Sequence, residues 1–159
     1  DLSLPDWERR LETVCGALVP LGAGLKIRGS GPTAVTPEKV AAVIETVCDR
    51  GLALKATAGL HHPISEPERY GNPLGFLNLL AALLLRRHHG TAFGSVELLA
   101  CLRTSDAADY RIGPGLRWRD WSLTDEEARR ARALAHFSIG SCSLHEPDAD
   151  LDRLFGPGR

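Results

Sequence analysis

The chain has 159 residues, 43% of them hydrophobic, which suits a single domain with its own core. A formal net charge of -1 and a pI near 6.7 give no electrostatic reason to expect a nucleic-acid partner. No apolar run reaches membrane-spanning length, no signal peptide is visible and the four cysteines form no C-x-x-C pair, so we expect a cytoplasmic protein with reduced thiols. The chain starts at Asp1 and contains no methionine, from which we expect a processed chain or a piece of a longer protein.

The first half of the chain predicts a βαβ unit. A helix is expected at residues 5–18, and residues 24–28 then alternate apolar and cationic side chains as a strand does. Thr36 and Pro37 supply the N-cap and the first turn of a second helix, and Gly51 can end it. A second strand is expected directly afterwards.

That second strand, residues 52–57, carries Lys55 on the side away from its apolar residues. Lys26 occupies the same place in the first strand, and Lys39 is the only other lysine. The spacing fits one strand, one helix and the next parallel strand. An amine beside a second cation loses its proton more easily, which favours a nucleophilic lysine, whereas an ordinary ion-paired lysine at a strand end is the alternative.

The rest of the chain alternates helices with short extended segments. Asn78 is a polar interruption near the start of a helix that is apolar nearly all round, and it is a candidate to face a site. His88 and His89 near the end of that helix are interpreted as capping residues rather than ligands. A polar loop or lid is expected at 64–75, a helix at 95–103 and a β-hairpin near 109–120; the second arm of the hairpin could instead be a barrel strand. A helix capped by Ser122 or Thr124 is expected to end near Leu134. It is followed by a strand at 137–143 and a terminal helix at 148–154.

This alternation predicts a parallel α/β fold in one domain, residues 1–159, with the hairpin as a possible insertion. Ligands of such folds gather at the carboxyl ends of the strands. The polar residues that three strand ends bring together are Lys26, Arg28, Lys55, Thr57, His61, His62, Ser141, Cys142, Ser143 and Glu146.

Residues 55–59, Lys-Ala-Thr-Ala-Gly, resemble the strand of deoxyribose-phosphate aldolase and related class I aldolase barrels, in which the lysine forms the substrate Schiff base. Over most of its length the chain resembles the carboxy-terminal half of a group of uncharacterised bacterial barrel-like proteins. That resemblance is carried by Lys-Ala-Thr-Ala-Gly-Leu-His-His-Pro at 55–63, Gly-Phe-Leu-Asn at 75–78, and Ile-Gly-Ser-Cys-Ser at 139–143 followed by Glu-Pro. It implies a TIM-like barrel.

Three or four strands cannot close an eight-stranded barrel. We therefore expect a half or partial TIM-like barrel, completed by a missing amino-terminal half or by a second copy. Association through the apolar Leu79–Leu85 helix, as a homodimer or with a partner half-barrel, would also bury that helix.

The favoured function is a class I aldolase or lyase that acts on a small carbonyl compound, phosphorylated or carboxylated, without a cofactor. Lys55 is the expected nucleophile, with Lys26 as its charged neighbour and His61 or His62 as proton shuttle; Glu146 can also move protons. The residues expected to contact the substrate are Arg28, Thr57, Asn78, Ser141, Cys142 and Ser143, the two serines holding an anionic group.

Two other interpretations stay open. A metal-dependent lyase, isomerase or hydrolase would hold a divalent ion with His61, His62 and Glu146 or Cys142, although adjacent histidines on an extended segment point opposite ways. Alternatively, the chain is a non-catalytic, barrel-derived interaction subunit whose polar cluster is a structural ion-pair network. Cys142, between two serines just past a strand, is also a candidate nucleophile.

Overall fold

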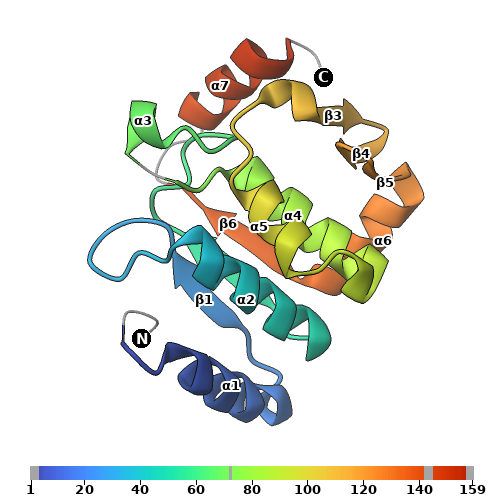
Figure 1. The fold of residues 1–159 in the computed structure, drawn as a ribbon. Coiled ribbons are helices and arrows are strands. Elements are labelled where there is room, and N and C mark those ends of the chain that lie inside the picture. The colour runs from blue at the N-terminus through green and yellow to red at the C-terminus, as the bar shows by residue number, and fades with distance from the viewer. Residues whose placement is uncertain (1–3, 72, 142–144, 157–159) are drawn as a thin grey trace.

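The computed structural model describes residues 4–71, 73–141 and 145–156. It has a mixed α/β fold with a three-stranded parallel sheet and a small antiparallel sheet (Figure 1). The elements in chain order, with η for short 3₁₀ helices, are α1 (Trp7–Leu18), η1 (Val19–Leu21), β1 (Leu25–Arg28), α2 (Pro37–Asp49), β2 (Leu54–Thr57), α3 (Pro67–Tyr70), α4 (Phe76–His89), η2 (Gly90–Ala92), α5 (Ser95–Leu102), η3 (Ala107–Asp109), β3 (Tyr110–Gly113), β4 (Gly115–Trp118), β5 (Trp121–Leu123), α6 (Asp125–Ala135), β6 (Phe137–Gly140) and α7 (His145–Phe155).

The parallel sheet has the strand order β1-β2-β6. Lys26 is the register partner of Lys55, and Lys55 is in turn the partner of Ser138 on β6. The predicted βαβ unit is therefore confirmed, and the two lysines lie on neighbouring strands at the same level of the sheet.

Local chemistry explains why the helix of this unit starts and stops where it does. Thr36 is the N-cap of α2, its side chain accepts a hydrogen bond from the Lys39 N–H at 3.5 Å, and Pro37 occupies the first turn. Gly51 follows the helix with φ +67°, a left-handed conformation that costs glycine little. Both ends of α2 are those predicted from the sequence.

Helices α2 and α4 lie along one face of the parallel sheet, and α5 packs against both of them (Figure 1). The strand side chains directed toward these helices, Ile27, Leu54 and Ala56, are buried. Lys26 and Lys55 lie on the opposite face and are exposed. The described helices therefore cover one face of this sheet and leave the other open.

Helix α4 is the centre of the hydrophobic core. Its side chains Leu79, Leu83 and Leu85 are fully buried, and α2, α5 and α6 pack around it. The expected burial of this helix is confirmed for most of its side chains, with Leu80 only partly buried. Its expected role as a dimer contact stays a prediction.

The segment between α5 and β6 contains the antiparallel sheet, in the order β3-β4-β5. Strands β3 and β4 form the predicted hairpin, so the second arm is not a further barrel strand. Strand β5 includes Ser122, where we expected only a helix cap. Thr124 is the N-cap of α6: its hydroxyl accepts the Glu127 N–H at 3.3 Å, and the Glu127 carboxylate accepts the Thr124 N–H at 2.8 Å.

The described residues form no closed barrel, because their parallel sheet has three strands and two free edges, β1 and β6. None of the helices in these residues is both long enough and apolar enough to span a bilayer.

Candidate functional site

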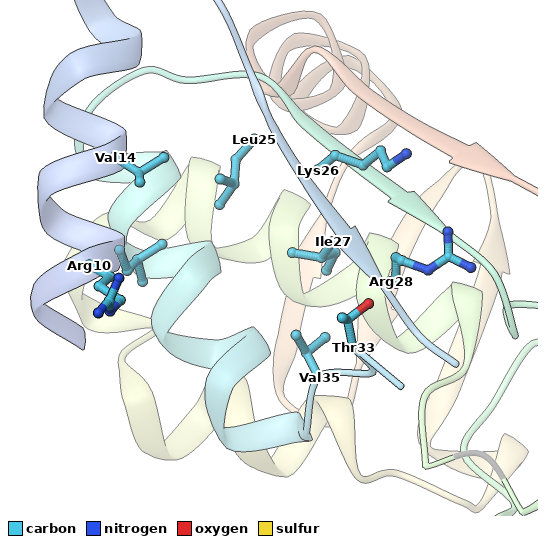
Figure 2. Close-up of a pocket in the computed structure, with 9 residues that line it drawn as sticks. Arg10, Val14, Leu25, Lys26, Ile27, Arg28, Thr33 and Val35 are labelled. Carbon is cyan, nitrogen blue, oxygen red and sulfur yellow. The ribbon is translucent and has the colours of Figure 1, made fainter. Parts of the chain in front are cut away.

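The open face of the parallel sheet carries several of the residues predicted to be functional. Because strand residues alternate between faces, Lys26 and Arg28 of β1 share this face with Lys55 and Thr57 of β2 and with Ser138 of β6. Figure 2 shows Lys26 and Arg28 projecting to the opposite side of β1 from the apolar side chains of that strand.

Within the described residues, the cations of this face have no ion-pair partner. Lys26, Arg28 and Lys55 are exposed, and within the described chain their side chains make no hydrogen bond or ion pair. Neighbouring strands lie about 4.8 Å apart, and like charges directly opposite each other destabilise a sheet. Lys26 and Lys55, which are directly opposite each other, therefore cost stability, and an anionic ligand would remove that cost.

A cavity of about 550 Å³ opens at the carboxyl ends of β1 and β2, within the size range of small-molecule sites. Loop 29–36, His61 and His62 form much of its wall. A Cβ atom on Gly29 would lie 2.7 Å from the carbonyl oxygen of Ala58, so the close approach of these two loops requires a glycine. The parallel sheet thus provides a pocket where α/β folds usually bind ligands.

Each pocket histidine contacts a different carboxylate of α7. His61 Nδ1 lies 3.1 Å from Glu146 Oε2, and His62 Nδ1 lies 2.6 Å from Asp150 Oδ2. Glu146 and Asp150 are four residues apart, so both lie on one face of the helix. Arg153, one turn further on, donates from Nε to Asp150 Oδ1 at 3.1 Å. The segment after β2 and the last helix are therefore joined at the pocket.

His62 is better suited to acid–base chemistry than His61. Its partner Asp150 is 16% exposed, whereas Glu146 is 60% exposed. Burial acts to raise the pKa of Asp150, but hydrogen bonds from His62 and Arg153 outweigh burial and hold that pKa below its ordinary value. The ionised carboxylate favours the tautomer with a proton on His62 Nδ1, which leaves Nε2 as the basic nitrogen.

The metal-site alternative depends on how His61, His62 and their carboxylate partners lie. The rings of His61 and His62 are 6.4 Å apart between centroids, and each contacts its own carboxylate. Within residues 4–71, 73–141 and 145–156, no group of three or more His, Cys, Asp or Glu side chains is placed to hold a metal ion. Cys142, the other predicted ligand, lies outside the described residues.

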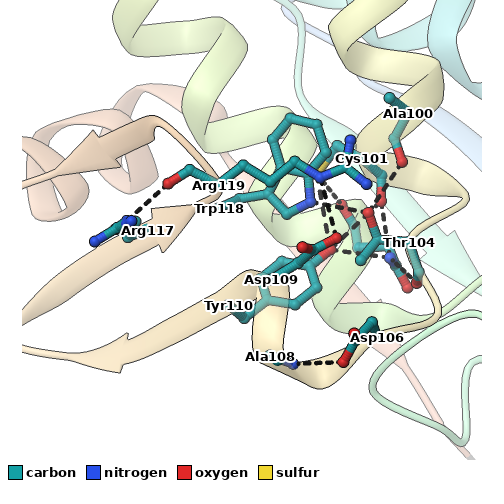
Figure 3. A network of polar contacts seen from close by, with 11 residues as sticks. Ala100, Cys101, Thr104, Asp106, Ala108, Asp109, Tyr110, Arg117, Trp118 and Arg119 are labelled. Carbon is teal, nitrogen blue, oxygen red and sulfur yellow. Dashed lines mark hydrogen bonds and ion pairs between the residues drawn. The ribbon is translucent and has the colours of Figure 1, made fainter.

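Asn78 lies in the core rather than at the pocket. Its Nδ2 donates to the carbonyl oxygens of Cys101 and Thr104 at 2.8 and 2.9 Å and lies 2.9 Å from Tyr110 Oη. Trp118 Nε1 extends this network by donating to Thr104 Oγ1 at 2.8 Å (Figure 3). Burial raises the pKa of the Cys101 thiol to about 12, which makes it unreactive. Asn78 therefore joins α4 to α5 and β3.

The predicted contacts after β6 are only partly described. Ser141 follows the strand and is half-buried. Cys142 and Ser143 lie outside the described residues, so their expected roles stay predictions.

The sequence analysis missed Ser138, Asp150 and Arg153. Ser138 alternates with the inward-facing residues of β6 and is the register partner of Lys55. The four-residue spacing from Glu146 to Asp150 was the available signal for the second carboxylate, because it places both on one helix face.

No family model, curated protein or solved structure matches this chain. The resemblance to bacterial barrel-like proteins therefore stays a prediction.

Proposed function

We propose that this chain is a class I lyase of the aldolase type, in which Lys55 forms a Schiff base with a small carbonyl compound. The observation that carries the proposal is the pairing in register of Lys26 and Lys55 on the open sheet face, with no acidic partner for either in the described chain. The third lysine, Lys39, lies on α2 with its Nζ 5.5 Å from the ring centre of Trp7, where it has a packing role.

The strand order supports a barrel-derived site. In doubly wound folds the strand order reverses and helices cover both faces of the sheet. Here the order β1-β2-β6 follows the chain, and the helices lie on one face, as they do in a segment of a TIM barrel. In this proposal the open face is the inner wall of a partial barrel, and further strands from a partner or another half complete it.

In the proposed reaction, the protonated imine that Lys55 forms with the substrate accepts the electrons of the bond that breaks. The neutral amine of Lys55 adds to the substrate carbonyl carbon, and the carbinolamine loses water to give a protonated imine. The bond between the α and β carbons then breaks toward the imine, and the β-hydroxyl proton passes to His62, whose orientation is fixed by Asp150. Protonation and hydrolysis of the enamine release the second product. Lys26 and Arg28 attract an anionic group on the substrate.

The test exploits the presence of only three lysines. Lys55→Arg, Lys26→Arg and the matched control Lys39→Arg each remove one primary amine and keep its charge. The native chain and each variant are incubated with acetaldehyde, glyceraldehyde or pyruvate plus borohydride, and the intact mass is measured. We expect one adduct in the native chain and in Lys39→Arg, and none in Lys55→Arg.

Peptide mapping then separates an adduct on Lys55 from one on the amino-terminal α-amine. An adduct that maps elsewhere, or that persists in Lys55→Arg, contradicts the proposal. If no carbonyl compound is trapped, the non-catalytic interaction subunit becomes the favoured function, and metal analysis decides whether the metal-dependent alternative needs to be considered.

A further inference from the structure

Strand β1 forms one edge of the parallel sheet, and its outer side has unused hydrogen-bonding groups. The Leu25 N–H donates to the Ala53 carbonyl, just before β2, and the Gly29 N–H donates to the Thr57 carbonyl at the end of β2. The alternate residues Lys26 and Arg28 therefore direct their backbone groups outward. The Arg28 carbonyl accepts the Val35 N–H at 3.1 Å. By the same alternation, the N–H groups of Lys26 and Arg28 and the Lys26 carbonyl point away from β2, and within the described residues they have no backbone partner outside the β1–β2 pairing.

An apolar groove of about 320 Å³ runs beside this edge, between β1 and α1 (Figure 2). Leu11 and Val14 of α1 line one side, and residues 25–28 of β1 line the other, so that Lys26 and Arg28 also border the groove. Val14 is 46% exposed although it lies next to the core. An added strand would bury Val14 and pair with the outer groups of β1 at the same time, which is the usual way a free strand edge is covered.

The charges beside the edge specify the sequence of such a strand. Side chains of an added strand alternate, so one set would enter the groove and the other would lie beside Lys26 and Arg28 on the open face. Cross-strand pairs of opposite charge stabilise a sheet. Neither cation has an acidic partner in the described chain, and an acidic set on the added strand would supply one.

A second copy of the chain is the wrong occupant for this edge. If two copies paired through the outer sides of their β1 strands, a two-fold axis near Ile27 would place Lys26 of one copy opposite Arg28 of the other. Such like-charge pairs destabilise the contact. A different segment, with acidic residues in alternate positions, suits the edge better.

We propose that the β1 edge binds an extended segment of a partner protein in which apolar and acidic residues alternate, adding a fourth strand to the parallel sheet. The apolar side chains fill the groove beside α1, and the acidic side chains pair with Lys26 and Arg28. This inference does not depend on Schiff-base chemistry at Lys55, although the added strand would form a wall beside the lysines.

The test uses two synthetic peptides and the intact chain. The first peptide is acetyl-Gly-Val-Glu-Val-Glu-Val-Gly-amide, and the second has lysine in place of glutamate. Amide hydrogen exchange and ¹H–¹⁵N shifts are recorded at millimolar peptide. We expect the glutamate peptide to slow exchange at the Lys26 and Arg28 amides and to bind about tenfold more tightly than the lysine peptide, because two favourable charge pairs replace two unfavourable ones.

Two sets of variants test the charge pairing and the backbone pairing separately. The double change Lys26→Glu and Arg28→Glu reverses the preference between the peptides, whereas Arg111→Glu with Arg132→Glu, which alters the same charge at exposed positions elsewhere, leaves it unchanged. Lys26→Pro removes the outward N–H, and it weakens binding relative to Lys26→Ala, which loses the same charge but keeps the N–H.

Equal binding of both peptides in all variants, or shifts that avoid β1 and α1, would overturn the inference. So would unchanged exchange at Lys26 and Arg28 with both peptides. None of these results bears on the borohydride adduct at Lys55. Failure of strand binding at the β1 edge can therefore be distinguished from failure of the proposed lyase activity.

Discussion

Replacing Asn78 by alanine distinguishes a core residue from a substrate contact. Asn78 is fully buried, and its Nδ2 donates to the carbonyl oxygens of Cys101 and Thr104 beside Tyr110 Oη. If it holds the core together, Asn78→Ala lowers stability in the absence of any ligand. If it binds substrate, the loss appears only in activity.

The expected cost follows from which groups lose their partner. The Cys101 carbonyl also accepts the Thr104 N–H at 3.3 Å, so it keeps a hydrogen bond, whereas the Thr104 carbonyl loses its described donor. A buried polar group left unpaired costs about 1–3 kcal/mol, and the small cavity adds to this. Asn78 Oδ1 itself has no partner in the described chain, so its removal offsets part of the cost. We expect a net loss of about 2 kcal/mol.

Urea and thermal unfolding measure this loss directly. For a chain of this size, about 2 kcal/mol corresponds to a fall in Tm of roughly 6 °C. Tyr110→Phe is the matched control, because it removes one hydroxyl from the same network and should cost less. A change below about 0.5 kcal/mol in Asn78→Ala, within the range of ordinary surface substitutions, would refute the core role.

Two further predictions concern α7 and α6. The pKa of Asp150 is lowered, so its contacts with His62 and Arg153 stabilise the fold above the ordinary aspartate value of 3.8 and are lost as the pH falls through the lower pKa of the folded state. Proteolysis of α7 should therefore increase below that value, and Asp150→Asn should remove this pH dependence; acid protection unchanged by Asp150→Asn would contradict the assignment. Thr124→Ala should cost about 1 kcal/mol of unfolding free energy because it removes the hydroxyl that caps α6, while Ser122→Ala, two residues earlier on β5, serves as the near-neutral control in urea unfolding.

Local residue chemistry was sufficient to predict α2 and the hairpin but not β5. Thr36, Pro37 and Gly51 act on the backbone at the positions they occupy, so their effect can be recognised without knowing the rest of the fold. Strand β5 has three residues and directly precedes the cap of α6, so its own sequence is too short to show an alternation. Its pairing with β4 depends on tertiary contacts that no local pattern contains.

The candidate site, like the fold, was predictable where it depends on local pattern and not where it depends on tertiary packing. Alternation placed Lys26 and Lys55 on one face, but it could not show that this face stays exposed, since that depends on where the helices pack. The sequence shows a polar Asn78 near the start of a helix, which fits a substrate contact and a core residue equally well. Only the approach of Cys101 and Tyr110, which are 23 and 32 residues away in the chain, makes it a core residue.

The connection between β2 and β6 has a consequence for the order of folding. Strand β2 ends at Thr57 and β6 starts at Phe137, so about 80 residues, including α4 and the antiparallel sheet, separate two strands that pair directly. Closing the much shorter connection between β1 and β2 costs less chain entropy, and contacts between distant residues generally form late. We therefore expect the lysine pair to be assembled early and Ser138 to join it last. Before β6 pairs with β2, the edges of the growing sheet are β1 and β2, and the cations on both strands disfavour pairing between like chains.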